Sequence, residues 1–185
     1  MVFNAANLLT LSRLVMGVIF FVLIAFKSWV AVPVLLLAGV TDLLDGWVAR
    51  KWNQQTDFGR IADPCIDKIL ICCGFIFLVN HSDQLVASWM AAVIVGRELV
   101  VTALRSFEES KGVVFHATFW GKSKMTVQFA ALAYLIFLVT WGRTDQAVLR
   151  IVAQVLVWMT LVVTVASGVV YLIQAQRLVR RRGNP

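Results

Sequence analysis

Residues 41–68 read TDLLDGWVARKWNQQTDFGRIADPCIDK and contain four aspartates in two helically spaced pairs. Asp42 and Asp45 are three positions apart, and Asp63 and Asp67 are four positions apart. Residues at these spacings share one face of a helix, so each pair can direct both carboxylates towards one point. Both pairs lie in or beside strongly apolar runs, where an ionised carboxylate is costly and usually serves a function.

The composition around this stretch is that of an integral membrane protein. Of 185 residues, 60% are hydrophobic and 15% are charged, and the mean hydropathy is +0.82. Soluble domains average about 45–50% apolar and about 25% charged residues. The net charge of +7 could suggest nucleic acid. However, the basic residues cluster at the ends of apolar runs, which is typical of cytoplasmic membrane loops, so we expect no nucleic-acid partner.

Six apolar runs approach the length of about 20 residues that crosses a bilayer. They cover residues 8–26, 29–50, 61–79, 86–107, 122–141 and 148–172. Lysine and arginine concentrate between the second and third runs, between the fourth and fifth, and in a basic tail at 175–185. The positive-inside rule therefore places both termini and the aspartate stretch in the cytoplasm. We predict an all-α integral membrane protein with six transmembrane helices, forming one domain over residues 1–185.

Small residues accompany the four aspartates on their helix faces: Gly46, Ala49 and Gly59. Small residues allow a backbone or a ligand to approach closely. If the two acidic faces oppose each other, like charges about 4 Å apart repel by roughly 4 kcal/mol per pair. Cations would have to neutralise them, and carboxylate ligands favour Mg²⁺ or Mn²⁺. Two such ions in one cluster suit a phosphoryl displacement.

Structural explanations of the same aspartates remain open at this point. Asp63 precedes Pro64 and could be a helix N-cap with proline at the first helical position. Asp67 could pair with Lys68 or with Arg60, and Asp42 and Asp45 could form ordinary interhelical ion pairs. A transporter or channel could also use the aspartates as a cation pathway, but its polar residues should then extend across the membrane midplane. Here they gather at one side.

The motif D-x-x-D-G-x-x-A-R, followed after eight residues by G-x-x-x-D-x-x-x-D, resembles the signature of the CDP-alcohol phosphotransferase family. This resemblance implies that the four aspartates hold two Mg²⁺ or Mn²⁺ ions and that Asp67 is the general base on the acceptor hydroxyl. It also implies a fold of six membrane helices that is usually homodimeric. The implied cytidine diphosphate site consists of Asp42, Gly46, Ala49, Arg50 and Gly59.

Three further stretches, FNAANLLTLSR, GRELVVTALR and GKSKMTVQ, resemble the bacterial phosphatidylglycerophosphate synthase branch of that family. The expected reaction moves the phosphatidyl group of CDP-diacylglycerol to the 1-hydroxyl of glycerol 3-phosphate, and CMP leaves. Such an enzyme belongs in the bacterial inner membrane, in contact with membrane lipids and with its active site facing the cytoplasm. The same chemistry with inositol phosphate or serine as acceptor is the alternative.

A phosphorylated acceptor needs cations, and four basic residues are candidates for binding its phosphate: Arg97, Arg105, Lys122 and Lys124. The two arginines are eight positions apart on one face of the fourth run. The two lysines stand where the fifth run begins, and a helix N-terminus itself attracts phosphate. The alternative explanation is topological, because cytoplasmic helix ends carry lysine and arginine whatever their function. Glu98 could also simply neutralise its neighbour.

Overall fold

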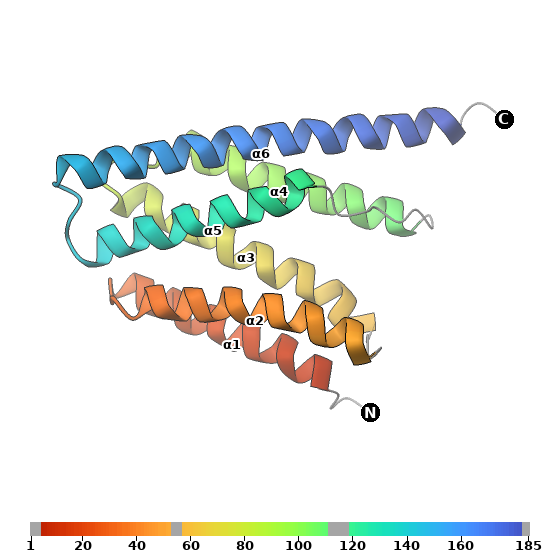
Figure 1. Ribbon diagram of the computed structural model, residues 1–185, viewed down its shortest axis with the longest axis horizontal. Coiled ribbons are helices and arrows are strands. Elements are labelled where there is room, and N and C mark those ends of the chain that lie inside the picture. Colours follow the sequence, from red (N-terminus) through yellow and green to blue (C-terminus); the bar gives the residue numbers. More distant parts are fainter. Residues whose placement is uncertain (1–4, 53–56, 111–118, 183–185) are drawn as a thin grey trace.

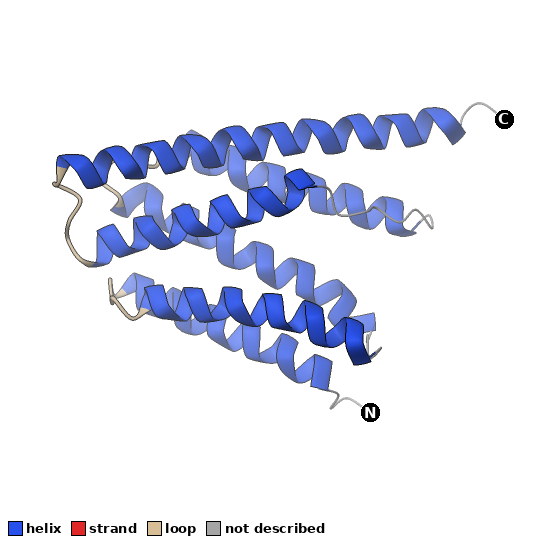
Figure 2. Cartoon of the chain, viewed as in Figure 1, coloured by secondary structure: helices blue, strands red, loops and turns tan. Residues whose placement is uncertain are grey.

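The computed structural model describes residues 5–52, 57–110 and 119–182, and its side-chain detail covers residues 15–41, 68–106, 123–174 and 176. These ranges contain six α-helices and no strand (Figure 2). The helices are α1 (Ala5–Ala25), α2 (Ala31–Trp52), α3 (Asp57–His81), α4 (Ser88–Ser110), α5 (Phe119–Thr140) and α6 (Ala147–Arg182). The all-α prediction is therefore confirmed for the described part of the chain.

Successive helices run in alternating directions, so one end of the bundle collects the start of α1, the end of α6 and the α2–α3 and α4–α5 connections (Figure 1). The opposite end carries three short loops. One of them closes α5 with Gly142, whose φ of +62° is the left-handed conformation that glycine adopts without steric cost. The Arg143 N–H then donates to the Leu138 carbonyl at 3.1 Å, which is the hydrogen bond of a Schellman cap.

Two helices differ from the predicted boundaries in ways that matter. Helix α3 begins at Asp57, before the predicted start at residue 61, so Pro64 lies inside the helix. The N-cap explanation of Asp63 is therefore wrong, because the helical backbone is already formed when the chain reaches that residue. Helix α6 continues to Arg182 through most of the predicted tail. Its 36 residues make it about 54 Å long, compared with about 30 Å for the hydrocarbon core of a bilayer.

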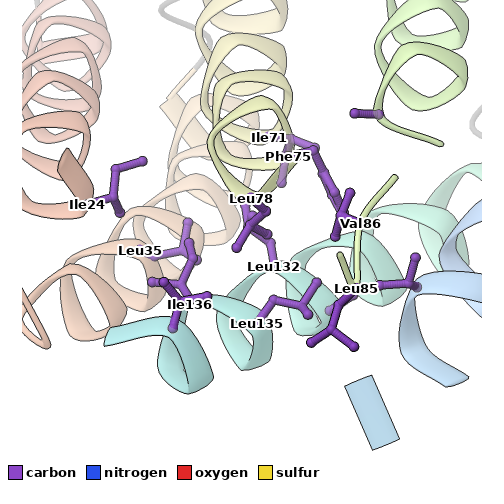
Figure 3. Close-up of a cluster of buried hydrophobic side chains, with 14 of the residues drawn as sticks. Ile24, Leu35, Ile71, Phe75, Leu78, Leu85, Val86, Leu132, Leu135 and Ile136 are labelled. Atoms are coloured by element: carbon purple, nitrogen blue, oxygen red, sulfur yellow. The ribbon is translucent and has the colours of Figure 1, made fainter. Parts of the chain in front are cut away.

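The core is apolar and receives side chains from all six helices. Figure 3 shows part of it, where Ile24, Leu35, Phe75, Leu132 and Ile136 gather among α1, α2, α3 and α5. Helices α3 and α5 approach closely at Gly74, where an added Cβ would lie 2.7 Å from Leu132 Cδ1. A small residue at such a contact lets two helices pack without a gap, as is common in membrane bundles.

The outer surface of the bundle is also apolar. Apart from Gln154, the exposed large residues of α6 between Val148 and Ile173 are hydrophobic: Val148, Ile151, Val152, Val155, Trp158, Met159, Val162, Val165, Val169, Leu172 and Ile173. Two described stretches, Ser123–Thr140 and Ala147–Gln174, are long and apolar enough to cross a bilayer. An apolar face of this length is unfavourable in water and favourable in hydrocarbon. The fold is that of a membrane protein.

Phe75 tests how much the packing of the core contributes to stability. Its side chain has no exposed area, whereas the neighbouring Ile76 is 54% exposed. Phe75→Ala should lower the free energy of unfolding by about 3–5 kcal/mol, because it removes buried contacts and leaves a cavity. Thermal or denaturant unfolding in detergent micelles measures the loss, with Ile76→Ala as the matched control. Equal losses in the two variants would contradict the described packing.

Candidate functional site

The four aspartates lie on the adjoining ends of α2 and α3. Asp42 and Asp45 belong to the second half of α2, and Asp63 and Asp67 belong to the first half of α3. Only residues 53–56 connect the two helices, so Trp52 and Asp57 are at most about 18 Å apart. The aspartate side chains themselves lie outside the described residues. The backbone thus brings the two helix ends together. That the four carboxylates converge on one point stays a prediction.

The same holds for the other predicted signature positions and for one candidate cation. Gly46, Ala49 and Arg50 lie in α2, Gly59 lies in α3 and Lys122 lies in α5, but their side-chain surroundings are outside the described part. Among the described side chains, no group of three metal-ligating residues occurs. The donor set on α2 and α3 consists of carboxylates, which are the ligands that Mg²⁺ and Mn²⁺ prefer, so its chemistry fits these ions.

Glu98 is the centre of the described polar site. This carboxylate is 1% exposed and lies in α4. Its Oε1 atom accepts hydrogen bonds from Lys124 Nζ on α5 and from Arg97 Nη1, the latter at 3.3 Å. On its other side, Lys68 Nζ of α3 lies 3.5 Å from Oε2. One buried carboxylate therefore holds cations from three helices, and each of these ions offsets part of the cost of burying the others.

Neutral polar groups extend this cluster to α6. Gln128 Nε2 donates to Glu98 Oε1 at 3.3 Å and to Thr164 Oγ1 at 3.1 Å. Arg97 Nη2 donates to Ser167 Oγ at 3.0 Å. Gln128, Thr164 and Ser167 are all buried, where an unpaired polar group costs about 1–3 kcal/mol. Their mutual bonds explain how a polar network is tolerated inside an apolar bundle.

The cluster borders directly on the aspartate stretch. Lys68 follows Asp67 in α3 and reaches Glu98 with its ammonium group. The length of one lysine side chain therefore separates Glu98 from the α3 backbone next to Asp67. The bundle thus brings the signature helices and the basic cluster to neighbouring positions.

The predicted acceptor-binding cations fall into two groups. Arg97, with a side chain 10% exposed, and Lys124, with one 3% exposed, meet at Glu98. Arg105 is exposed and lies two turns further along α4. The idea that Glu98 only neutralises Arg97 is incomplete, because the same carboxylate also holds Lys124 and Lys68.

Sequence reasoning missed the contribution of α6. The polar residues Thr164, Ser167 and Tyr171 recur at helical spacing within its apolar run, which places them on one face. That periodicity was a usable signal that this face meets something polar. It did not reveal the partner, because Arg97 is 70 positions away from Ser167 in the chain.

The described cluster has the chemistry of an anion site. Arg97, Lys124 and Lys68 contribute three positive charges, and Glu98 supplies one negative charge. A guanidinium and an ammonium group in a partly dry setting form strong, charge-assisted hydrogen bonds with phosphate oxygens. The site therefore combines a carboxylate donor set on α2 and α3 with a basic polar cluster on α3, α4, α5 and α6.

Comparison with known proteins agrees with this chemistry. The model of the CDP-alcohol phosphatidyltransferase family matches residues 3–166. A CDP-diacylglycerol–glycerol-3-phosphate 3-phosphatidyltransferase of Haemophilus influenzae is 32% identical over 181 residues, covering 93% of this chain and 93% of the relative. The proteins of the same name from Salmonella choleraesuis and Escherichia coli K12 are each 34% identical over 143 residues, covering 74% of this chain and 79% of each relative.

The family match covers nearly the whole chain and includes every position of the aspartate motif. The matches also cover most of the length of each relative. The chain is thus a member of the CDP-alcohol phosphatidyltransferase family.

Proposed function

We propose that this protein transfers the phosphatidyl group of CDP-diacylglycerol to the 1-hydroxyl of sn-glycerol 3-phosphate, producing phosphatidylglycerophosphate and CMP. The observation that carries the proposal is the ion pair between Lys68 and Glu98. It joins the helix of the second aspartate pair to a buried cluster suited to a phosphorylated acceptor. Relatives that match most of the chain bear the name of this activity.

The aspartates on α2 and α3 act on the pyrophosphate and on the attacking hydroxyl. Asp42, Asp45, Asp63 and Asp67 would hold two Mg²⁺ or Mn²⁺ ions, which supply positive charge to the attacking and leaving oxygens of the displacement. Asp67 accepts the proton of the acceptor hydroxyl as its oxygen bonds to the phosphatidyl phosphorus. The bond from that phosphorus to the bridging oxygen breaks, and CMP carries the electron pair away.

The remaining signature residues bind the nucleotide. Gly46, Ala49 and Gly59 leave room for the cytidine diphosphate beside the helix backbones. Arg50 lies near its phosphates, where a guanidinium can form two parallel hydrogen bonds. Arg97 and Lys124, with Arg105 and Lys122 at the approach, bind the phosphate of the acceptor.

The membrane arrangement follows from charge and connectivity. We infer six spans with both termini in the cytoplasm, because the arginine- and lysine-rich connections and the end of α6 share one end of the bundle. The lipid substrate can then keep its acyl chains in the inner membrane of a bacterial cell while its pyrophosphate reaches the cytoplasmic surface. Membrane lipids cover the apolar outer surface, and the family resemblance supports a homodimer.

Other acceptors would use the same donor chemistry. Serine carries no phosphate and offers Arg97 and Lys124 only its singly charged carboxylate, which is balanced by its own ammonium group. Inositol phosphate carries one, so the basic cluster alone does not separate it from glycerol 3-phosphate. The names of the relatives favour glycerol 3-phosphate.

An acceptor comparison tests the proposed reaction. Purified protein in detergent micelles, supplied with CDP-diacylglycerol and Mg²⁺ or Mn²⁺, should release CMP with glycerol 3-phosphate and show little turnover with inositol phosphate or serine. Chromatography of the radiolabelled lipid identifies the product. Turnover with inositol phosphate and none with glycerol 3-phosphate would contradict the proposed acceptor.

Asp67→Asn tests the general base. The amide cannot accept the hydroxyl proton, so kcat should fall by at least about a hundredfold, while the circular dichroism and elution volume of the protein stay unchanged. Asp145→Asn, an exposed carboxylate in the α5–α6 loop, is the matched control and should keep full activity. Retained turnover in the Asp67 variant would exclude its role as the base.

Lys124→Gln tests the acceptor-phosphate site. Loss of a charge-assisted hydrogen bond should raise the KM for glycerol 3-phosphate by about ten- to a hundredfold, with a much smaller change in the KM for CDP-diacylglycerol. Lys124→Arg keeps the charge and should recover part of the affinity. Arg143→Gln, exposed at the opposite end of the bundle, is the control. A parallel rise of both KM values would argue for a general structural effect.

A further inference from the structure

Helix α6 contributes no residue to the aspartate signature, yet it forms most of the surroundings of Arg97. Ser167 Oγ accepts a hydrogen bond from Arg97 Nη2 at 3.0 Å. The ring of Tyr171 lies below the guanidinium, with its centroid 5.7 Å from Cζ, a distance at which a cation and an aromatic face attract. Gly168 lies between these two contacts on the same helix face.

Gly168 leaves space for the stem of the arginine. A Cβ added at this position would lie 3.1 Å from Arg97 Cγ and 3.7 Å from Arg97 Nε. The first distance is shorter than an ordinary van der Waals contact, so an added Cβ would shift the arginine side chain by a few tenths of an ångström. The glycine is thus matched to the position of Arg97 and not to a turn, because it lies inside a continuous helix.

A closed set of hydrogen bonds fixes the direction of the guanidinium. The Ser167 hydroxyl donates to the Thr164 carbonyl at 2.8 Å, which leaves its oxygen free to accept from Arg97. Gln128 connects Thr164 to Glu98, and Arg97 Nη1 returns to the same carboxylate. Networks in which each member is held by two others strongly limit side-chain movement.

One donor of this arginine is left over. The Arg97 side chain is only 10% exposed. Its Nε atom is buried and has no hydrogen-bond partner among the described residues. A buried N–H without an acceptor destabilises the fold. Because Nε itself is enclosed beside Gly168, a phosphate oxygen would meet the outer N–H donors of Nη1 and Nη2, and phosphate is an acceptor that a guanidinium binds strongly.

We propose that Ser167, Gly168 and Tyr171 of α6 are positioning residues that hold Arg97 in the orientation in which it binds the phosphate of the acceptor. This inference rests on the proposed function and adds α6 to the determinants of acceptor affinity. The three residues touch the arginine and not the acceptor, so they act through the placement of its guanidinium.

Gly168→Ala separates positioning from folding. Alanine is a better helix former than glycine, which offsets the cost of shifting Arg97, so the melting temperature in micelles should stay close to that of the parent protein. The KM for glycerol 3-phosphate should nevertheless increase about three- to tenfold, the size of one displaced hydrogen bond. The KM for CDP-diacylglycerol and the kcat at saturating acceptor should not change. Gly17→Ala is the matched control, because no described atom lies within 4 Å of its added Cβ.

Tyr171 provides a second, conservative comparison. Tyr171→Phe keeps the aromatic face and should retain most of the acceptor affinity, whereas Tyr171→Leu removes it and should raise the KM for glycerol 3-phosphate. Equilibrium binding of radiolabelled glycerol 3-phosphate to the micellar protein should follow the same order. Equal effects of phenylalanine and leucine would overturn the role assigned to the ring.

Arg97→Lys separates the role of Arg97 as a phosphate ligand from the positioning of Arg97 by α6. A raised KM for glycerol 3-phosphate in this variant, together with normal values in Gly168→Ala and Tyr171→Leu, would keep Arg97 as a ligand and overturn positioning by α6. An unchanged KM in Arg97→Lys would overturn both the acceptor site and the inference. Combined Arg97→Lys and Tyr171→Leu should cost less than the two separate effects added, because both changes act on one contact.

Discussion

A single buried carboxylate determines how the polar interior of this protein is arranged. Glu98 is almost completely enclosed, and an isolated charge in that setting would cost several kcal/mol. Contacts with Lys124, Arg97 and Lys68 offset this cost and at the same time stabilise the cations, of which Lys124 is the most deeply buried. Three helices are thereby tied to one point, and their relative placement follows from electrostatics as much as from apolar packing.

The apolar surfaces explain why the polar groups are concentrated at this point. Helices with hydrophobic residues on both their inner and outer faces gain little from exchanging one apolar neighbour for another, because lipid chains and leucine side chains are alike. Close approach at small residues such as Gly74, and the hydrogen bonds around Glu98, then decide which helices become neighbours. The long helix α6 uses both means, since it approaches Arg97 closely at Gly168 and bonds to the polar cluster through Thr164 and Ser167.

The division of labour between helices follows from this arrangement. Helices α2 and α3 carry the two pairs of aspartates on ends that residues 53–56 join, which suits chemistry at a pyrophosphate. Helices α4, α5 and α6 carry the basic and neutral polar groups that suit a second phosphate. Lys68 lies on α3 beside the aspartates, but its ammonium group contacts Glu98 in the polar cluster. A reaction between a pyrophosphate lipid and a phosphorylated alcohol needs both sets beside each other.

The amino-acid pattern alone was sufficient for the six helices, for the membrane class and for the aspartate motif, because hydrophobic run length and fixed local spacing are properties of neighbouring residues. It also selected Arg97 and Lys124 as candidates. It could not show that Pro64 lies inside a helix, that Glu98 holds Lys124 and Lys68, or that Ser167 and Tyr171 surround Arg97. Those contacts join residues far apart in the chain, and only the packing of the helices brings them within hydrogen-bond distance.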